Sequence, residues 1–155
     1  MQRRKYRNVG IVVIDEKNRI LLTHQSRGWN APGGKIELSD ASVFLAAKRE
    51  FAEEVTMPFP FSRAECKTCV YTCHKKKCLL FYNIKPITVD ESNQIIQTYD
   101  RTKVKYQENN DITFYSITDL INLNPIITGH YKKKNRPARF MKRVCKIVLN
   151  SSKRW

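Results

Sequence analysis

The sequence predicts a single domain of the α+β class, in which strands and helices share one core. Three observations favour this class: two early apolar runs with strand character, an amphipathic stretch with helical spacing near residue 50, and a later strand pair followed by a C-terminal amphipathic stretch. The 155 residues fall within the range of one domain, and no internal repeat or linker divides them. We therefore expect one domain over residues 1–155.

The first strands are expected on either side of a turn. Residues 1–7 form a basic, polar leader, after which Val9–Ile14 and Arg19–His24 flank the turn-like Asp15–Asn18. This arrangement is typical of a β-hairpin. The stretch 28–34 then predicts a loop, because its glycines and proline interrupt regular structure.

A helix is expected over residues 40–55. Ser39 or Asp40 fits its N-cap, and Pro58 follows its end. At about 100° per residue, three apolar side chains fall on one narrow arc that should face the core: Phe44, Phe51 and Val55.

A strand pair is expected in the middle of the chain. Residues 67–74 and 78–84 have strand character, and Lys75–Lys77 joins them. The next stretch, 86–110, is polar, and its pattern does not assign it to a helix or a strand.

The C-terminal third predicts one strand and two helices. Residues 112–116 have strand character, and a short helix is expected from Thr118 or Asp119 to Leu123. Residues 137–150 predict a longer amphipathic helix with a basic exposed face.

The chain is strongly basic, with 29 Lys and Arg against 14 Asp and Glu and a formal charge of +15. Such a charge repels itself in a compact fold unless it meets anionic partners. Polyphosphates and nucleic acid are therefore the expected partner classes, and a generally basic surface that maintains solubility is the alternative.

The early apolar stretch Val9–Ile14 is too short for a signal-peptide core or a membrane span. We therefore expect a cytoplasmic protein without a membrane partner. The Lys-, Asn- and Ile-rich composition is typical of an AT-rich genome, such as that of a virus.

Five cysteines without an export signal indicate reduced thiols. Four of them raise the question of a zinc site: Cys66, Cys69, Cys73 and Cys78. Strand alternation places Cys69 and Cys73 on one face of the strand and Cys66 on the other. We therefore expect no structural zinc there.

The most informative stretch is Arg49-Glu-Phe-Ala-Glu-Glu54. On a helix Glu50, Glu53 and Glu54 share one side, and like charges at this spacing are destabilising. Hard divalent cations between the carboxylates would remove that repulsion, and Mg²⁺ is the natural candidate. The alternative is an ordinary solvated acidic face that Lys48 and Arg49 neutralise.

A glycine turn precedes this helix. The stretch Ala31-Pro-Gly-Gly-Lys-Ile-Glu37 allows its backbone to approach a metal or a phosphate closely, because glycine lacks a Cβ. A Pro-Gly-Gly turn is common by itself, and its position just before the acidic helix is what makes it informative.

The spacing from Gly34 through Asp40 to Arg49-Glu-Phe-Ala-Glu-Glu54 resembles the Nudix box, from about Gly33 to Met57. Three features depart from the family pattern. Asp40 stands in place of a Glu, eight residues rather than seven separate it from Arg49, and Thr56 replaces the last Gly. The departures put the equivalence of Asp40 and the geometry of the helix end in question.

The resemblance implies the Nudix fold, an α/β/α sandwich with a mixed sheet between helices, and a MutT-like pyrophosphohydrolase. It implies that Mg²⁺, or Mn²⁺, is held by the carbonyl of Gly33 and by Glu50, Glu53 and Glu54, while Arg49 orients the carboxylates. A water then attacks phosphorus, and the general base is Glu53, Glu54 or an acid in a later loop, for which the candidates are Glu108 and Asp111.

Residues outside the box should select the substrate by stacking, hydrogen bonding or charge. The candidates are Arg27, Trp29, Asn30, Lys35, Phe81 or Tyr82, and Lys132. The alternative for each of them is a side chain that only packs in the core or at its rim. The basic surface favours highly charged substrates: capped RNA, a dinucleoside polyphosphate, a diphosphoinositol polyphosphate or a noncanonical nucleoside triphosphate. The alternative function is a noncatalytic RNA-binding protein on a Nudix scaffold. The intact carboxylates argue against it.

Overall fold

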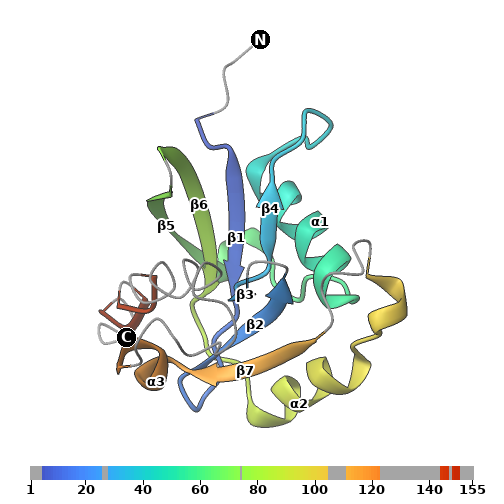
Figure 1. Cartoon of the computed structure of the whole chain (residues 1–155), viewed down its shortest axis with the longest axis vertical. Coiled ribbons are helices and arrows are strands. Elements are labelled where there is room, and N and C mark those ends of the chain that lie inside the picture. Colours follow the sequence, from blue (N-terminus) through green and yellow to red (C-terminus); the bar gives the residue numbers. More distant parts are fainter. Residues whose placement is uncertain are drawn as a thin grey trace.

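Two β-sheets form the centre of the molecule in the computed structural model (Figure 1). The structure describes residues 5–25, 28–73, 75–104, 111–122, 144–146 and 148–150. The larger sheet has the strand order β4-β1-β6-β5, and its strands are β1 (Asn8–Val12), β4 (Gly33–Lys35), β5 (Cys66–Cys73) and β6 (Lys76–Asn83). The smaller sheet has the order β3-β2-β7, and its strands are β2 (Arg19–Gln25), β3 (Gly28–Asn30) and β7 (Ile112–Ser116).

The larger sheet is mixed, as the sequence predicts. Strand β1 pairs with β4 in antiparallel and with β6 in parallel orientation, and β5 and β6 form an antiparallel hairpin. The smaller sheet is antiparallel throughout. Strands β5, β6 and β7 confirm three elements expected from the sequence.

Helices cover both faces of the sheets. The described helices are α1 (Val43–Val55), α2 (Val89–Thr98) and α3 (Ile117–Asn122), with short 3-10 turns at Arg63–Glu65 and Arg101–Lys103. Residues 144–146 and 148–150 are also helical and belong to the predicted helix 137–150, whose other residues lie outside the described part. Within the described residues, no helix is long and apolar enough to cross a membrane.

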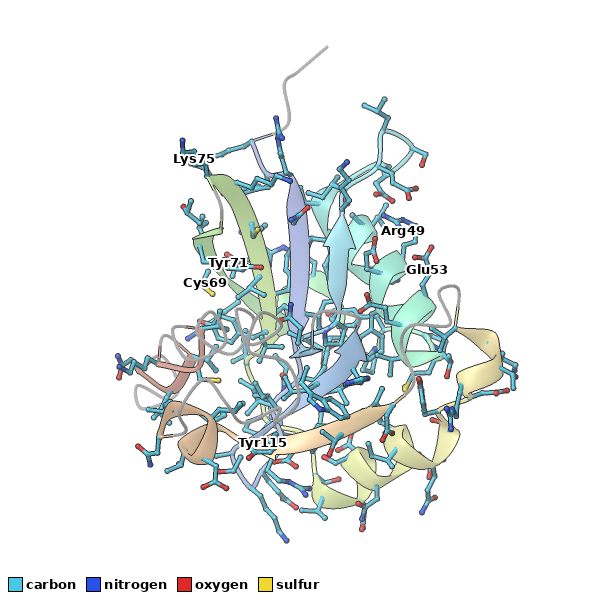
Figure 2. The ribbon with its side chains drawn as sticks, in the orientation of Figure 1. Arg49, Glu53, Cys69, Tyr71, Lys75 and Tyr115 are labelled. Carbon is cyan, nitrogen blue, oxygen red and sulfur yellow. The ribbon has the colours of Figure 1, made fainter. Side chains whose placement is uncertain are left out.

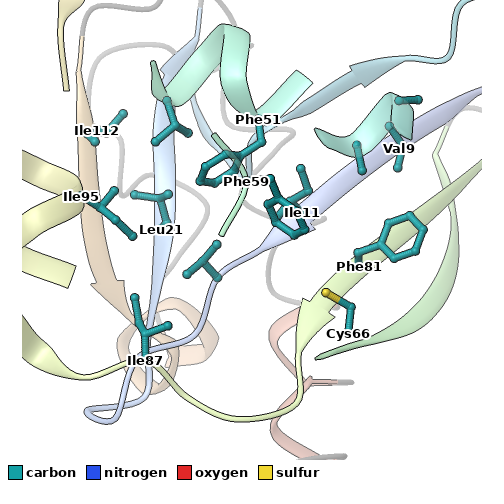
Figure 3. Close-up of a cluster of buried hydrophobic side chains, with 14 residues drawn as sticks. Val9, Ile11, Leu21, Phe51, Phe59, Cys66, Phe81, Ile87, Ile95 and Ile112 are labelled. Atoms are coloured by element: carbon teal, nitrogen blue, oxygen red, sulfur yellow. The ribbon is translucent and has the colours of Figure 1, made fainter. Parts of the chain in front are cut away.

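Two clusters of buried side chains fill the space between the layers. The first core cluster joins α1 to the sheets and includes Phe51 of α1, Val9 of β1 and Phe81 of β6 (Figure 3). The second core cluster lies against α3 and the C-terminal helical residues, with Leu80, Leu120 and Val148 among its members. Apolar layers on both sides of the sheets confirm the predicted α/β/α sandwich.

The predicted hairpin between the first two strands forms only next to its turn. There Ile14 and Ile20 form an antiparallel bridge, the Asp15 N–H donates to the Arg19 carbonyl at 2.9 Å, and the Leu21 N–H donates to the Val13 carbonyl at 3.1 Å. Strands β1 and β2 themselves belong to different sheets. The local alternation of apolar residues gave the strands correctly. It contains no information on which partner each strand chooses.

Two buried polar side chains hold the crossing between the sheets. Asn83 accepts a hydrogen bond from the Ile14 N–H at 2.8 Å and donates to the Ile14 carbonyl at 2.9 Å. Asp15, which is fully buried, accepts from the Arg19 Nε at 2.7 Å and from the Ser92 hydroxyl at 3.2 Å. Since Ser92 lies on α2, Asp15 ties the turn to a helix far along the chain.

Helix α2 is an element that the sequence analysis did not predict. Its N-terminus carries a reciprocal capping box, in which the Thr88 hydroxyl accepts from the Glu91 N–H and the Glu91 carboxylate accepts from the Thr88 N–H, both at 3.1 Å. The spacing of Thr88 and Glu91 after Pro86 is a helix-start signal that was available in the sequence.

Helix α1 ends at Thr56, where the Nudix pattern has Gly. Thr56 adopts the left-handed conformation, with φ 60° and ψ 31°, and its N–H donates to the Ala52 carbonyl at 3.1 Å. Its hydroxyl accepts from the Asp100 N–H at 2.9 Å. A β-branched residue is strained in this conformation, and the hydrogen bond to Asp100 offsets part of that strain.

Replacing Asp15 with Asn should destabilise the fold by about 2 kcal/mol, because an amide has only one acceptor oxygen. Either the donors on Oδ2, which are the Arg19 Nε and the Ser92 hydroxyl, or those on Oδ1, which are the backbone N–H groups of Lys17 and Arg19, then lose their acceptor. Urea unfolding measures the change. Asp90→Asn, an exposed control in α2, should cost less than about 1 kcal/mol. Equal costs for the two variants would contradict the bridging role of Asp15.

Two variants of Thr56 should separate backbone strain from the hydroxyl contact. Thr56→Gly and Thr56→Ala both lose the hydrogen bond to Asp100, but only Gly is free of the left-handed penalty. We expect the Gly variant to be more stable than the Ala variant by about 1 kcal/mol in urea unfolding. Variants of equal stability would show that the residue is not strained.

Candidate functional site

The acidic side of α1 is built around Arg49. The guanidinium binds the carboxylate of Asp40 through two hydrogen bonds, with its Nε donating to Oδ1 and its Nη2 to Oδ2, each at 2.9 Å. Its Nη2 also donates to the carbonyl of Lys35 at 3.1 Å. Arg49 therefore fastens α1 to the chain that precedes the helix.

The same guanidinium reaches the carboxylates of its own helix. Its Nη1 donates to Glu50 at 3.0 Å and lies 3.4 Å from both oxygens of Glu53 (Figure 2). These contacts, led by the hydrogen bond with Asp40, raise the pKa of Arg49 above its ordinary value. Arg49 therefore stays charged and reduces the repulsion between Glu50 and Glu53.

Asp40 reaches Arg49 because the helix starts later than the sequence predicts. The N-cap is Ser42, whose hydroxyl accepts from the Leu45 N–H at 3.1 Å, so the expected cap at Ser39 or Asp40 is wrong. Asp40 lies in a turn closed by its own N–H, which donates to the Glu37 carbonyl at 3.0 Å. The turn absorbs the extra residue before Arg49.

The glycines of β4 let the strand lie directly against the carboxylates. The Gly33 N–H donates to the Glu54 Oε2 at 2.9 Å. A Cβ at Gly34 would lie 2.6 Å from the Glu50 carboxyl carbon, and one at Gly33 would lie 2.4 Å from the Val9 carbonyl oxygen. A side chain at Gly33 would overlap the backbone of β1, so the close approach requires glycine there, whereas one at Gly34 would displace the carboxylate of Glu50.

Burial makes two of these carboxylates hard to ionise. It raises the pKa of Glu54 to about 8, against the hydrogen bond from Gly33, and the charges of Glu50 and Glu53 add to the rise. Burial also raises the pKa of Glu50, and Arg49 opposes that rise. A cation beside Glu54, in addition to Arg49, would offset the cost of ionising these buried carboxylates.

The residues fit a hard divalent cation in their chemistry. Every candidate ligand offers oxygen, which Mg²⁺ and Mn²⁺ prefer. The Glu50 Oε2 and the Glu54 Oε1 accept no hydrogen bond within the described part of the chain. No three acidic side chains of the described residues converge on one point as they stand, because Arg49 and Gly33 engage them separately.

Two acids outside α1 are candidates for the general base, and the structure describes one of them. Glu108 lies outside the described residues. Asp111 is exposed at the start of β7, where its carbonyl accepts from the His24 N–H at 2.9 Å and its carboxylate from the Ile112 N–H at 2.8 Å. It therefore lies beside the end of β2.

The candidate substrate residues have different surroundings. Trp29 is half-buried, with its ring 5.0 Å from that of His24, a neighbour that the sequence analysis did not single out. The Asn30 side chain folds back to accept from the Ala31 N–H at 2.9 Å. Lys35 is exposed at the end of β4.

The structure corrects the prediction that Phe81 or Tyr82 contacts the substrate. Phe81 and Tyr82 are only 2% and 3% exposed and pack in the two core clusters, so their rings do not frame a base. Arg27 and Lys132 lie outside the described residues.

A groove of about 530 Å³ runs along the outer side of α1, next to Arg49. Its walls combine apolar and basic side chains: Lys48, Arg49, Ala52, Thr56, Met57, Pro58, Phe59 and Lys103. Arg49 therefore borders both the groove and the carboxylates of α1.

The cysteines lie apart in the way that strand alternation predicts. Cys66 packs in the first core cluster, and Cys69 packs against the second, on the other side of the sheet. Burial raises the pKa of each thiol to about 11, which favours the protonated form. Neither position offers a thiolate to a shared zinc ion.

Comparison with known proteins shows the family of the chain. A family model described as the NUDIX domain matches residues 4–122. No curated protein sequence matches the chain. Among solved structures, a NUDIX hydrolase from Nitrosomonas europaea is 19% identical, covers 95% of this chain and 88% of its own, and has a TM-score of 0.56. A C. elegans Ap4A hydrolase is 17% identical, covers 91% and 96%, and has a TM-score of 0.48.

The buried Glu54 predicts how stability depends on pH without divalent metal. Its folded pKa of about 8 lies above the unfolded value near 4.5, so its contribution to stability is full below pH 4.5 and is lost as the pH rises through 8. Glu54→Gln should therefore be more stable than the wild type by roughly 2–4 kcal/mol at about pH 8.5, and the gap should close by about pH 5.

Unfolding in urea with a chelator at the two pH values measures this difference. Asp90→Asn, which removes an exposed carboxylate, should show no such pH-dependent gain. Parallel stability curves for the wild type and Glu54→Gln would contradict the burial of an ionisable Glu54.

Proposed function

Because this chain belongs to the Nudix family, a family of phosphoric anhydride hydrolases, we propose that it cleaves a pyrophosphate bond in a nucleotide-based substrate with the help of Mg²⁺ or Mn²⁺. The observation that carries the proposal is that the carboxylates of Glu50 and Glu54 lie against the glycine strand β4, with Glu53 beside them on α1. Burial disfavours negative charge on Glu50 and Glu54. A divalent cation between them would offset that cost.

The ligands proposed for the ion are the three carboxylates and the Gly33 carbonyl. When bound, a divalent cation supplies positive charge that stabilises the negative charge developing on the phosphate oxygens. The chain itself provides the positioning. Arg49 fixes Glu50 and Glu53 relative to Asp40, and the Gly33 N–H fixes one oxygen of Glu54.

Glu54 is suited to hold a proton as well as a cation. Its second oxygen accepts no hydrogen bond within the described part of the chain, so it is available to a cation or to the attacking water. Glu53, Glu108 and Asp111 are the other candidates for accepting the proton of the attacking water. Asp111 reaches solvent beside β2, so a substrate bound along that edge would lie within reach of its carboxylate.

The charge of the chain supports a substrate with several phosphates. A formal charge of +15 attracts highly anionic molecules and favours capped RNA, dinucleoside polyphosphates or diphosphoinositol polyphosphates over a sugar nucleotide. A noncanonical nucleoside triphosphate belongs to the same proposal. Trp29 is a described aromatic side chain that is suitably placed to contact a base, because it is half-buried rather than enclosed.

Glu54→Gln should lower metal-dependent turnover at least about 100-fold, since the variant loses a ligand charge and a proton acceptor. The assay incubates each protein with Mg²⁺ or Mn²⁺ and a panel of nucleoside triphosphates, dinucleoside polyphosphates, diphosphoinositol phosphates and capped RNA, and identifies the products. The substrate with the highest kcat/KM defines the bond that is cleaved.

Asp90→Asn serves as the control, because it removes an equal charge on α2, and its turnover should match the wild type. Unchanged turnover in Glu54→Gln would refute the role of this residue. If the wild type cleaves nothing with either metal yet binds RNA tightly, the noncatalytic alternative replaces the proposal.

A further inference from the structure

Cationic side chains gather at one end of the larger sheet. Strand register brings them together, because Asn8 of β1 lies opposite both Lys35 of β4 and Cys78 of β6. The Arg7 N–H donates to the Lys77 carbonyl at 3.0 Å, which extends the pairing by one residue. Six exposed residues make up this basic sheet end: Lys5, Arg7, Lys35, Lys75, Lys76 and Lys77.

The hairpin between β5 and β6 carries half of this charge. Cys73 pairs with Lys76, so Lys75 lies in the tight turn, where its φ is 63° (Figure 2). Lysines at a hairpin tip bury little surface and contribute little to the core. Three consecutive lysines at this position are therefore not explained by packing.

The basic sheet end lacks compensating acids. In the described part of the chain no ion pair joins any of its six cations to a carboxylate. Asp15 and Glu65 lie at the opposite end of the larger sheet, where β1 leads into the turn and β5 begins. The nearest acids in sequence, Glu37 and Asp40, interact with Arg49 instead.

We propose that the basic sheet end binds the phosphate backbone of a nucleic acid. Neighbouring strands present their residues about 4.8 Å apart, and a nucleic-acid strand carries a charge about every 3.4 Å, so several cations can each meet a phosphate. Contacts of this kind carry no sequence preference. A membrane surface would need apolar side chains beside the cations, and the only strongly exposed one near this end of the described chain is Leu38.

The basic sheet end also leads toward the carboxylate cluster. Lys35 is its member on β4, and the Lys35 carbonyl accepts from Arg49 at 3.1 Å. A strand of nucleic acid along this end would thus have one side close to β4 and α1. Binding itself needs neither the metal nor hydrolysis, so it is separable from the proposed function.

The test is a titration of a short fluorescent single-stranded RNA, and of a duplex, with the whole chain in chelator, from about 0.05 to 0.3 M salt. The variant K75Q/K76Q/K77Q removes three charges from the basic sheet end. The control K17Q/K85Q/K103Q removes three exposed charges elsewhere, so both variants have the same net charge. A third variant, K75R/K76R/K77R, restores the charge at the tip.

Losing three phosphate contacts should weaken single-strand binding roughly 50-fold at 0.15 M salt and reduce the slope of log K against log salt by about 2. The control should bind more than about tenfold tighter than K75Q/K76Q/K77Q, and the arginine variant should match the wild type. Comparing the affinities for the single strand and the duplex shows which form of nucleic acid the basic sheet end binds more tightly.

Three outcomes would overturn the proposal. Equal weakening in both glutamine variants would show that net charge alone attracts the RNA. The absence of wild-type binding to either nucleic acid would exclude the interface. Binding to vesicles that contain phosphatidylserine, without binding to RNA, would assign the surface to a membrane.

Discussion

The site depends on one interaction, the contact of the Arg49 guanidinium with four parts of the chain. It pairs with Asp40, donates to the Lys35 carbonyl, and neutralises Glu50 and Glu53. Without this cation, the carboxylates on α1 would repel each other at helical spacing, and the turn before the helix would lose its anchor. Because Arg cannot be deprotonated and presents donors in a fixed plane, Lys could not fill the same position.

The site also depends on the close approach of β4 to α1 and β1. Gly33 and Gly34 bring the backbone of β4 so near to α1 and β1 that a Cβ at either position would overlap a neighbour. One consequence is the hydrogen bond from the Gly33 N–H to Glu54. Another is a buried carboxyl with a pKa of about 8, which lowers stability at high pH. If Glu54 holds a cation as proposed, the bound ion would offset this loss of stability.

The acidic stretch can be recognised from the sequence because its residues lie close together in the chain. Contacts between residues that are distant in the chain are much harder to predict. Strands β1 and β2 follow from local alternation, whereas their assignment to different sheets depends on pairing with β4, β6, β3 and β7. The partnership of Asp40 with Arg49 depends on a turn that shifts the helix start to Ser42. Burial of Tyr82 depends on packing against the second core cluster, which no local pattern encodes. Helix α2, by contrast, was readable from Thr88 and Glu91.

The acidic and basic side chains of the described chain lie in different places, so the residues that would attract an anionic substrate are not those of the carboxylate cluster. The carboxylate cluster is the part of the described chain that would repel a polyphosphate, and Arg49 is already engaged by acids. Affinity for an anionic substrate must therefore come from cations outside the cluster, or from a divalent ion within it. The six cations of the basic sheet end are not engaged by acids among the described residues, and the strand that carries Lys35 also carries Gly33. A long polyanion can draw on both sources of attraction at once, whereas a mononucleotide at the cluster depends on the ion alone. If the basic sheet end binds phosphates as proposed, a preference for long, highly charged substrates would come from binding outside the carboxylate cluster.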